Sequence, residues 1–207
     1  MVRSVEILAP TFLEYLAVRC TLPHARVSWT GLGLARWKGA HQGSIVVVCG
    51  LVGALAPGLR PGTILIPDRV GLADGGIMHC DPALVQALVT AARTLHFQPD
   101  TGPLLTARYL IVGGDRLNWS QQGFVAADME TGLLAGRNLR VATIRVVLDS
   151  PEHGISPDWL RPTRALLQPS LWRELFWLSR IAPRYALRAA RVLKVGLGTG
   201  PDSIFPE

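Results

Sequence analysis

Short apolar runs alternate with mixed segments along the first 150 residues, and this alternation predicts a sheet with helices on its faces. The runs at residues 45–48 and 141–147 are mostly apolar, which is typical of central strands covered on both faces. Strands are expected at residues 5–9, 26–30, 44–49, 62–67, 104–109 and 141–148, and helices at residues 12–22, 82–95 and 129–135. The fold class indicated is α/β.

The pattern changes in the last quarter of the chain. Three of the six tryptophans lie here, at Trp159, Trp172 and Trp177. At helical spacing one stripe is basic and the opposite one is apolar: Arg184, Arg188, Arg191 and Val195 against Ala186, Ala189, Ala190 and Leu193. We expect an α/β body over residues 1–154, basic, Trp-containing helices of the same domain over 155–195, and a loose tail over 196–207.

The net charge of +6 is concentrated in this part of the chain, since residues 161–194 hold eight basic side chains and one acid, Glu174. Arginine, tryptophan and leucine on amphipathic helices are typical of an element that lies on a membrane surface. Helices that pack on the sheet and expose an arginine face explain the same residues. No nucleic-acid-binding motif accompanies the charge, so no nucleic-acid partner is expected.

Composition narrows the class of protein. With 207 residues, 49% hydrophobic and 17% charged, the chain is expected to fold as one domain rather than to stay disordered. No apolar run approaches the roughly 20 residues that a membrane helix needs. Three widely spaced cysteines favour a reduced, cytoplasmic compartment. His79, Cys80 and Asp81 have poor spacing for a metal, and no metal or cofactor is expected.

Three carboxylates, Glu14, Glu130 and Asp149, follow predicted strands, where ligands usually bind in such sheets. Each also has a common structural explanation. Glu14, and Glu130 together with Asp128, would suit the first turn of a helix, and Asp149 would suit a turn or cap. Their positions alone leave the function open.

Three blocks together resemble the nucleoside phosphorylase and nucleosidase superfamily, over about residues 5–153. The first is a glycine-rich turn at residues 49–68. The second is residues 127–135, which resemble the family's Met-Glu ribose motif, and the third is residues 145–149, which resemble its base-site aspartate motif. The resemblance implies a single-domain, three-layer fold with a central mixed sheet flanked by helices, and a homodimer.

The resemblance also implies hydrolysis of an N-glycosidic bond. Asp149 would protonate the leaving purine near N7, which requires its carboxyl to hold a proton near pH 7, as a dry pocket at a strand end would favour. Glu130 would bind the ribose hydroxyls, and Glu14 would take a proton from the attacking water. Met129 would pack on the sugar. The further substrate-binding residues implied are Asp128, Gly50, Leu51 and Gly53.

Water is favoured over phosphate as the nucleophile, because the early loop offers no arginine before Arg19 to bind phosphate. A purine nucleoside phosphorylase is the alternative. Two positions depart from the family pattern, since Leu51 replaces a small hydroxyl residue and Leu148 replaces a serine. They motivate a non-enzyme alternative, an inactive nucleoside-binding, membrane-associated protein. Tyr109 and Trp119 are candidates to stack on the base.

A short body followed by Arg/Leu-rich helices resembles the hopanoid-biosynthesis branch of the superfamily. That resemblance implies release of adenine from adenosylhopane to give ribosylhopane, so the partner would be an adenine nucleoside with a lipidic 5′ group. Residues 155–195 would then make peripheral contact with the inner face of the cytoplasmic membrane. Methylthioadenosine, S-adenosylhomocysteine or futalosine are the alternative substrates.

Overall fold

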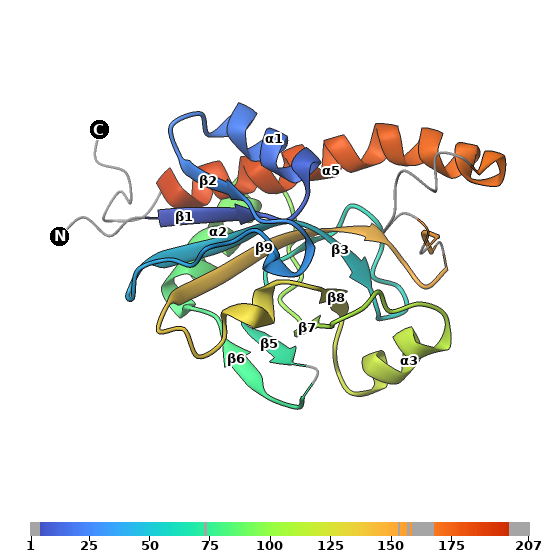
Figure 1. Ribbon diagram of the computed structural model, residues 1–207, viewed down its shortest axis with the longest axis horizontal. Helices are drawn as coiled ribbons and strands as arrows, with labels where there is room; N and C mark the ends of the chain where they lie inside the picture. The colour runs from blue at the N-terminus through green and yellow to red at the C-terminus, as the bar shows by residue number, and fades with distance from the viewer. Residues whose placement is uncertain (1–4, 73, 153, 157, 159–167, 199–207) are drawn as a thin grey trace.

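Two long parallel strands form the centre of the computed structural model, which describes residues 5–72, 74–152, 154–156, 158 and 168–198. Strands β3 (Ile45–Ala54) and β9 (Arg140–Asp149) are ten residues each and pair along their whole length, with a register shift between Val52 and Gly53 (Figure 1). Both were expected from their apolar runs. Strand β3 continues five residues beyond the expected end, because residues 50–54 still pair with β8 or β9.

The remaining strands make the sheet mixed, as expected. β1 (Val5–Ala9) lies parallel to the first half of β3, and β2 (Arg26–Trp29) lies parallel to β1. The end of β3 pairs antiparallel with β8 (Ala126–Asp128). The sheet then continues through β7 (Leu104–Thr106), β5 (Arg69–Leu72) and β6 (Ile77–His79), while β4 (Ile64–Leu65) pairs with β9.

Alternate side chains of the central strands enter two separate cores. Ile45, Val47 and Cys49 face the helices α1 (Phe12–Thr21), α2 (Pro82–Thr94) and α5 (Trp172–Gly198). Val46 and Val48 pack on the other side with residues of two 3-10 turns, η1 (Leu32–Leu34) and η2 (Thr131–Leu134). The expectation that the central strands are covered on both faces is therefore confirmed.

Helix α5 crosses the helical face of the sheet and contacts α1 and α2 (Figure 1). Its apolar stripe is buried, with Ala186, Ala189, Ala190 and Leu193 in the core, while Arg184, Arg191 and Lys194 are exposed, so this part of the helix packs on the sheet. From Trp172 to Ile181 no residue is buried, and this end extends beyond the strands. The helix also includes Gly196 and Gly198, which were expected to belong to a loose tail. Residues 159–167, with Trp159, and 199–207 lie outside the described residues.

The prediction of a helix at residues 129–135 is wrong. Only the 3-10 turn η2 forms: the Asp128 carboxylate accepts hydrogen bonds from the backbone N–H groups of Glu130 and Thr131 at its start, and the left-handed backbone of Gly136 (φ 72°) follows its end. The expected strands at 62–67 and 104–109 are also shorter. Helix α3 (Gly114–Gln121), the 3-10 turn η4 (Pro169–Leu171), the hairpin of β5 and β6, and strand β8 were not expected.

Candidate active site

A cavity of about 260 Å³ lies where β3, β8 and β9 end. We call it the carboxylate cavity, because Glu14, Glu130 and Asp149 all line it, together with Asp128, Met129, Leu51 and Gly53. The side chains that sequence analysis singled out therefore meet in one place. Gly50 does not line the cavity, but it is needed beside it. A side chain at this position would overlap the Glu14 carboxylate.

Glu14 is 3% exposed and both of its carboxylate oxygens are bound by backbone N–H groups. Oε2 accepts from Thr11 (2.6 Å) and Oε1 accepts from Leu51 (2.6 Å). Thr11 Oγ1 accepts in return from the Glu14 N–H at 3.3 Å, which completes a capping box at the start of α1. The helix-capping explanation and the position in the cavity are therefore both correct for this residue.

Arg145 is fully buried in the middle of β9 and was not assigned a role from the sequence. Its Nη2 pairs with the Asp128 carboxylate and lies 3.3 Å from Glu130 Oε2. Nε donates to Thr143 Oγ1 (3.1 Å) and Nη1 to the Leu51 carbonyl (3.5 Å). The sequence signal was a charged residue in an otherwise apolar strand, since a buried arginine requires acidic partners.

Glu130 lies between Arg145 and the turn at η1. Its Oε1 accepts from the Gly33 N–H at 3.1 Å and its Oε2 from Arg145. The pKa of Glu130 is raised to about 7: burial is the main cause and the charges of Asp128 and Glu14 add to it, while Arg145 and the Gly33 N–H act in the opposite direction. This carboxyl therefore changes charge near neutral pH.

Both carboxylate oxygens of Asp128 are bound by protein groups, and they hold the turn that follows β8. Its carboxylate pairs with Arg145 and accepts from Thr106 Oγ1 (2.6 Å) and from the backbone of Glu130 and Thr131. Thr106 Oγ1 in turn accepts from the Gly132 N–H at 2.7 Å. These contacts fix the position of the Met129–Glu130 segment above the cavity.

Asp149 is 6% exposed at the other end of the cavity. Its Oδ2 accepts from the Ile155 N–H at 3.2 Å and pairs with the guanidinium of Arg116, a second residue that sequence analysis missed. The dry strand end expected for Asp149 is present. The sequence did not indicate the ion pair with Arg116.

The structure also places the side chains that could stack on the base, act as a nucleophile or bind a metal. Leu110 lines the carboxylate cavity, whereas neither Tyr109, which is 63% exposed, nor Trp119, which packs on Phe124, is among its lining residues. Burial raises the pKa of Cys49 to about 12, so this thiol is no nucleophile. No group of three metal-ligating side chains occurs among the described residues.

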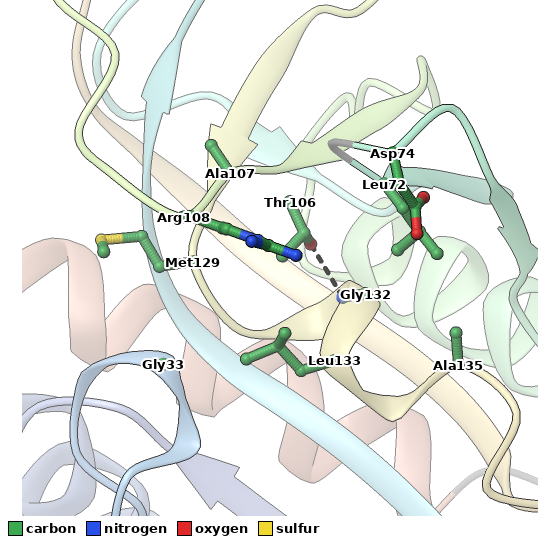
Figure 2. Close-up of a pocket in the computed structure, with 10 residues that line it drawn as sticks. All are labelled: Gly33, Leu72, Asp74, Thr106, Ala107, Arg108, Met129, Gly132, Leu133 and Ala135. Atoms are coloured by element: carbon green, nitrogen blue, oxygen red, sulfur yellow. Dashed lines mark hydrogen bonds between the residues drawn. The ribbon is translucent and has the colours of Figure 1, made fainter.

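A second cavity of about 410 Å³ adjoins the first, and Met129 lines both. Figure 2 shows Met129 at one end of this neighbouring cavity and Asp74 at the other, with the Arg108 side chain between them. Leu72, Leu133, Ala107 and Ala135 supply apolar lining. The two cavities therefore meet at the methionine expected to pack on the sugar.

Comparison with known proteins identifies the family of the chain. A family model described as the phosphorylase superfamily matches residues 35–159, which is more than half of the chain. A search of curated proteins found no match.

Solved structures share the fold at low sequence identity. A methylthioadenosine/S-adenosylhomocysteine nucleosidase of Helicobacter pylori is 14% identical, with a TM-score of 0.72 over 95% of this chain and 98% of that one. Futalosine hydrolase of the same organism is 13% identical, with a TM-score of 0.72 over 95% and 98%. The Neisseria meningitidis methylthioadenosine/S-adenosylhomocysteine nucleosidase is 14% identical, with a TM-score of 0.72 over 96% and 100%. At these identities the likeness is one of fold.

Replacing Arg145 by Met should lower the free energy of unfolding by about 3–5 kcal/mol, because Asp128 and Glu130 would remain buried without their cation. Urea unfolding near pH 7 measures the loss, which should shrink toward about pH 5 as the carboxyl groups take up protons. Arg140→Met is the control, since the Arg140 side chain is 33% exposed in its pair with Asp81 and should contribute about 0–1 kcal/mol. Equal losses in the two variants would contradict this account.

Proposed function

The chain belongs to the phosphorylase superfamily, and from that membership we propose that it is a nucleosidase that hydrolyses the N-glycosidic bond of a 5′-substituted adenosine and releases adenine. The observation that carries this proposal is the meeting of Glu14, Glu130 and Asp149 in one cavity. The structural neighbours are consistent with it. One is a nucleosidase crystallised with 5′-methylthioadenosine in its active site, and another is a futalosine hydrolase.

The proposed chemistry divides the work among the three carboxyl groups. The bond between C1′ and N9 breaks and its electron pair goes to the base, which takes a proton at N7 from Asp149. A water oxygen bonds to C1′, and the proton that it loses goes to Glu14. Glu130 accepts hydrogen bonds from the ribose hydroxyls and stabilises positive charge as it develops on the sugar.

Water is a better nucleophile than phosphate for this cavity. Arg145 is the only arginine among its described lining residues, and its guanidinium already binds Asp128, Glu130 and Thr143. A phosphate would also face the buried carboxylate of Glu14, which repels it. A purine nucleoside phosphorylase would need a guanidinium or ammonium group that is free to bind the anion.

We propose an apolar 5′ group, with adenosylhopane converted to ribosylhopane as the reaction. Leu32, Leu51, Leu148 and Ile155 give the carboxylate cavity an apolar wall, and the neighbouring cavity adds further apolar space beside Met129. Methylthioadenosine, S-adenosylhomocysteine and futalosine are the alternative substrates. A nucleoside-binding protein without catalysis is the non-enzyme alternative. It would bind the nucleoside but release no adenine, which distinguishes it from a nucleosidase.

The N-terminal part of α5 supports peripheral contact with the inner face of the cytoplasmic membrane. Trp172 is 58% and Phe176 59% exposed, and the Arg180 guanidinium lies 4.0 Å from the centre of the Phe176 ring. Large apolar side chains beside arginines are suited to an anionic lipid surface. No helix among the described residues is long and apolar enough to cross a membrane.

We also propose a homodimer, as the family resemblance implies. Phe12, Leu16 and Trp29 are exposed large apolar side chains, and the rings of Phe12 and Trp29 lie 5.3 Å apart. Such a group of apolar side chains would be covered by a second copy of the chain.

The purified protein should release free adenine from adenosylhopane in phosphate-free buffer, and chromatography measures the product. Asp149→Asn should slow release by about 10²–10⁴-fold, because the variant cannot protonate the leaving base. Asp81→Asn, which removes a remote ion-paired carboxylate, should retain activity. Methylthioadenosine is the comparison substrate. Adenine from methylthioadenosine alone would overturn the lipid substrate, and no adenine from either would overturn the nucleosidase.

KM should fall as the pH rises through about 7, because the charged Glu130 accepts hydrogen bonds from both ribose hydroxyls better than the neutral acid does. Initial rates over about pH 5–9 measure this dependence. Glu130→Gln should have a high KM that no longer changes in this range. A wild-type KM that is constant with pH would argue against Glu130 as the ribose ligand.

Membrane contact predicts flotation of the protein with vesicles that contain phosphatidylglycerol, less at high salt and not with phosphatidylcholine alone. The double variant Trp172→Ala and Phe176→Ala should lose binding, whereas Phe12→Ala with Trp29→Ala should keep it. Equal flotation of both variants with the wild type would refute contact through α5.

A further inference from the structure

Helix α3 has one buried side chain, and it is a basic one. The helix reads Gly-Asp-Arg-Leu-Asn-Trp-Ser-Gln, and of these eight residues only Arg116 is buried, at 4% exposed. The apolar residues of the helix are less buried than this arginine, since Trp119 is half-buried against Phe124 and Leu117 is 50% exposed. Burying a guanidinium is costly and an ion pair of this kind adds little net stability, so the arrangement calls for a functional explanation.

Arg116 is anchored at all three of its guanidinium nitrogens. Nε donates to the Ile111 carbonyl and Nη1 to the Ala54 carbonyl, each at 3.1 Å, and Nη2 pairs with Asp149 Oδ2. Ala54 ends β3 and Ile111 follows β7, so two separate segments hold the guanidinium in place. A planar guanidinium whose three nitrogens donate to fixed acceptors (the fork of Arg116) has one orientation. It can therefore orient the carboxylate that it binds.

Both hydrogen bonds described for the Asp149 carboxylate go to Oδ2, from Arg116 and from the Ile155 N–H. Oδ1 lies beside Gly53, where an added Cβ would come within 2.9 Å of it. Asp149 and Gly53 both line the carboxylate cavity. One oxygen is thus held by the protein, and the glycine leaves room for the other.

We propose that Arg116 is the positioning residue of Asp149: it holds Oδ2 so that Oδ1 faces the purine, and it stabilises the carboxylate that remains when the base takes its proton. This inference rests on the proposed nucleosidase function. As the glycosidic bond breaks, the proton on Asp149 moves to the purine nitrogen and the electron pair of its O–H bond stays on the carboxylate. Arg116 keeps its own protons throughout and supplies the opposing charge.

The positive charge of Arg116 also bears on the pH dependence of the reaction. Removing a guanidinium from beside the proton donor should let adenine release continue to higher pH. The other groups around Asp149 are the Ile155 N–H and Gly53, while Glu14, Glu130, Asp128 and Arg145 also line the cavity, and Glu174 on α5 accepts from the Ser156 N–H. Glu130 also titrates near neutral pH, but Arg116 is not among the causes of its shift.

Arg116→Gln and Arg116→Lys test the inference through adenine release as a function of pH. Arg116→Gln should lower kcat by about 10–100-fold, as removal of an orienting partner typically does, with a smaller effect on KM. Its alkaline loss of activity should move to higher pH by about one unit or more. Arg116→Lys keeps the charge and loses the fork, so it should retain the wild-type pH limit with a reduced kcat.

Arg140→Gln is the matched control, because it breaks another Arg–Asp pair and should alter neither kcat nor the pH profile. A pH profile of Arg116→Gln that overlays the wild type would overturn the proposal, and so would a shifted limit in Arg116→Lys. If Arg116→Gln does not fold, the lysine variant still decides, since unchanged kcat in it would exclude orientation by the fork.

A wild-type protein that releases no adenine would overturn the nucleosidase, and adenine binding then tests Arg116 separately. In calorimetry Arg116→Gln should bind adenine about tenfold more weakly, since its base-site carboxylate is no longer oriented. Unchanged affinity, or no adenine binding by the wild type, would overturn the role of Arg116.

Discussion

The guanidinium of Arg145 holds together segments that reach the cavity from three parts of the chain. The side chain projects from β9 at the centre of the sheet. Its guanidinium pairs with Asp128 at the end of β8, lies 3.3 Å from Glu130 Oε2, and donates to the carbonyl of Leu51 on β3. A fully buried charge is tolerated only when acidic groups surround it, so these segments must meet at this point. Asp128, once held, also bends the chain into the turn that carries Met129 and Glu130.

The three carboxyl groups of the cavity have three different environments. Glu14 is bound by two backbone N–H groups, Glu130 is buried beside one cation and two acids, and Asp149 is paired with Arg116. Groups of the same chemistry take different roles when their surroundings favour different charges. In the proposed function the Arg145 side of the cavity binds the sugar, the Arg116 side binds the base, and Glu14 on the N-terminal helix takes the proton from water.

Sequence reasoning was most successful where elements are long and their ends are marked. The apolar runs of β3 and β9 and the Asp81-Pro82 start of α2 predicted these elements, and three carboxylates at strand ends were correctly expected to meet. It failed for β8 and for the hairpin of β5 and β6, because these short strands do not stand out as apolar runs in the sequence. The prediction of a helix after Asp128 was wrong because Gly136 and Asn138 have left-handed backbone conformations (φ 72° and 51°), which end the turn after η2.

The two arginines were missed for a different reason. Arg145 precedes Asp149 by four residues but pairs with Asp128, and Arg116 reaches Asp149 from a short polar helix 33 positions earlier. Neither pairing follows from spacing, since each depends on which strands become neighbours in the sheet. A charged residue in an apolar strand was a visible signal for Arg145, whereas α3 offered none.

The proposed function requires water, and not phosphate, to attack C1′ of the nucleoside. Mass spectrometry of the sugar product tests this after turnover of adenosylhopane in heavy-oxygen water that also contains phosphate. Hydrolysis should give a free sugar with the heavy oxygen on C1′ and no sugar phosphate. A ribosyl 1-phosphate product would contradict it, because phosphate would then have entered a site that is built around carboxylates.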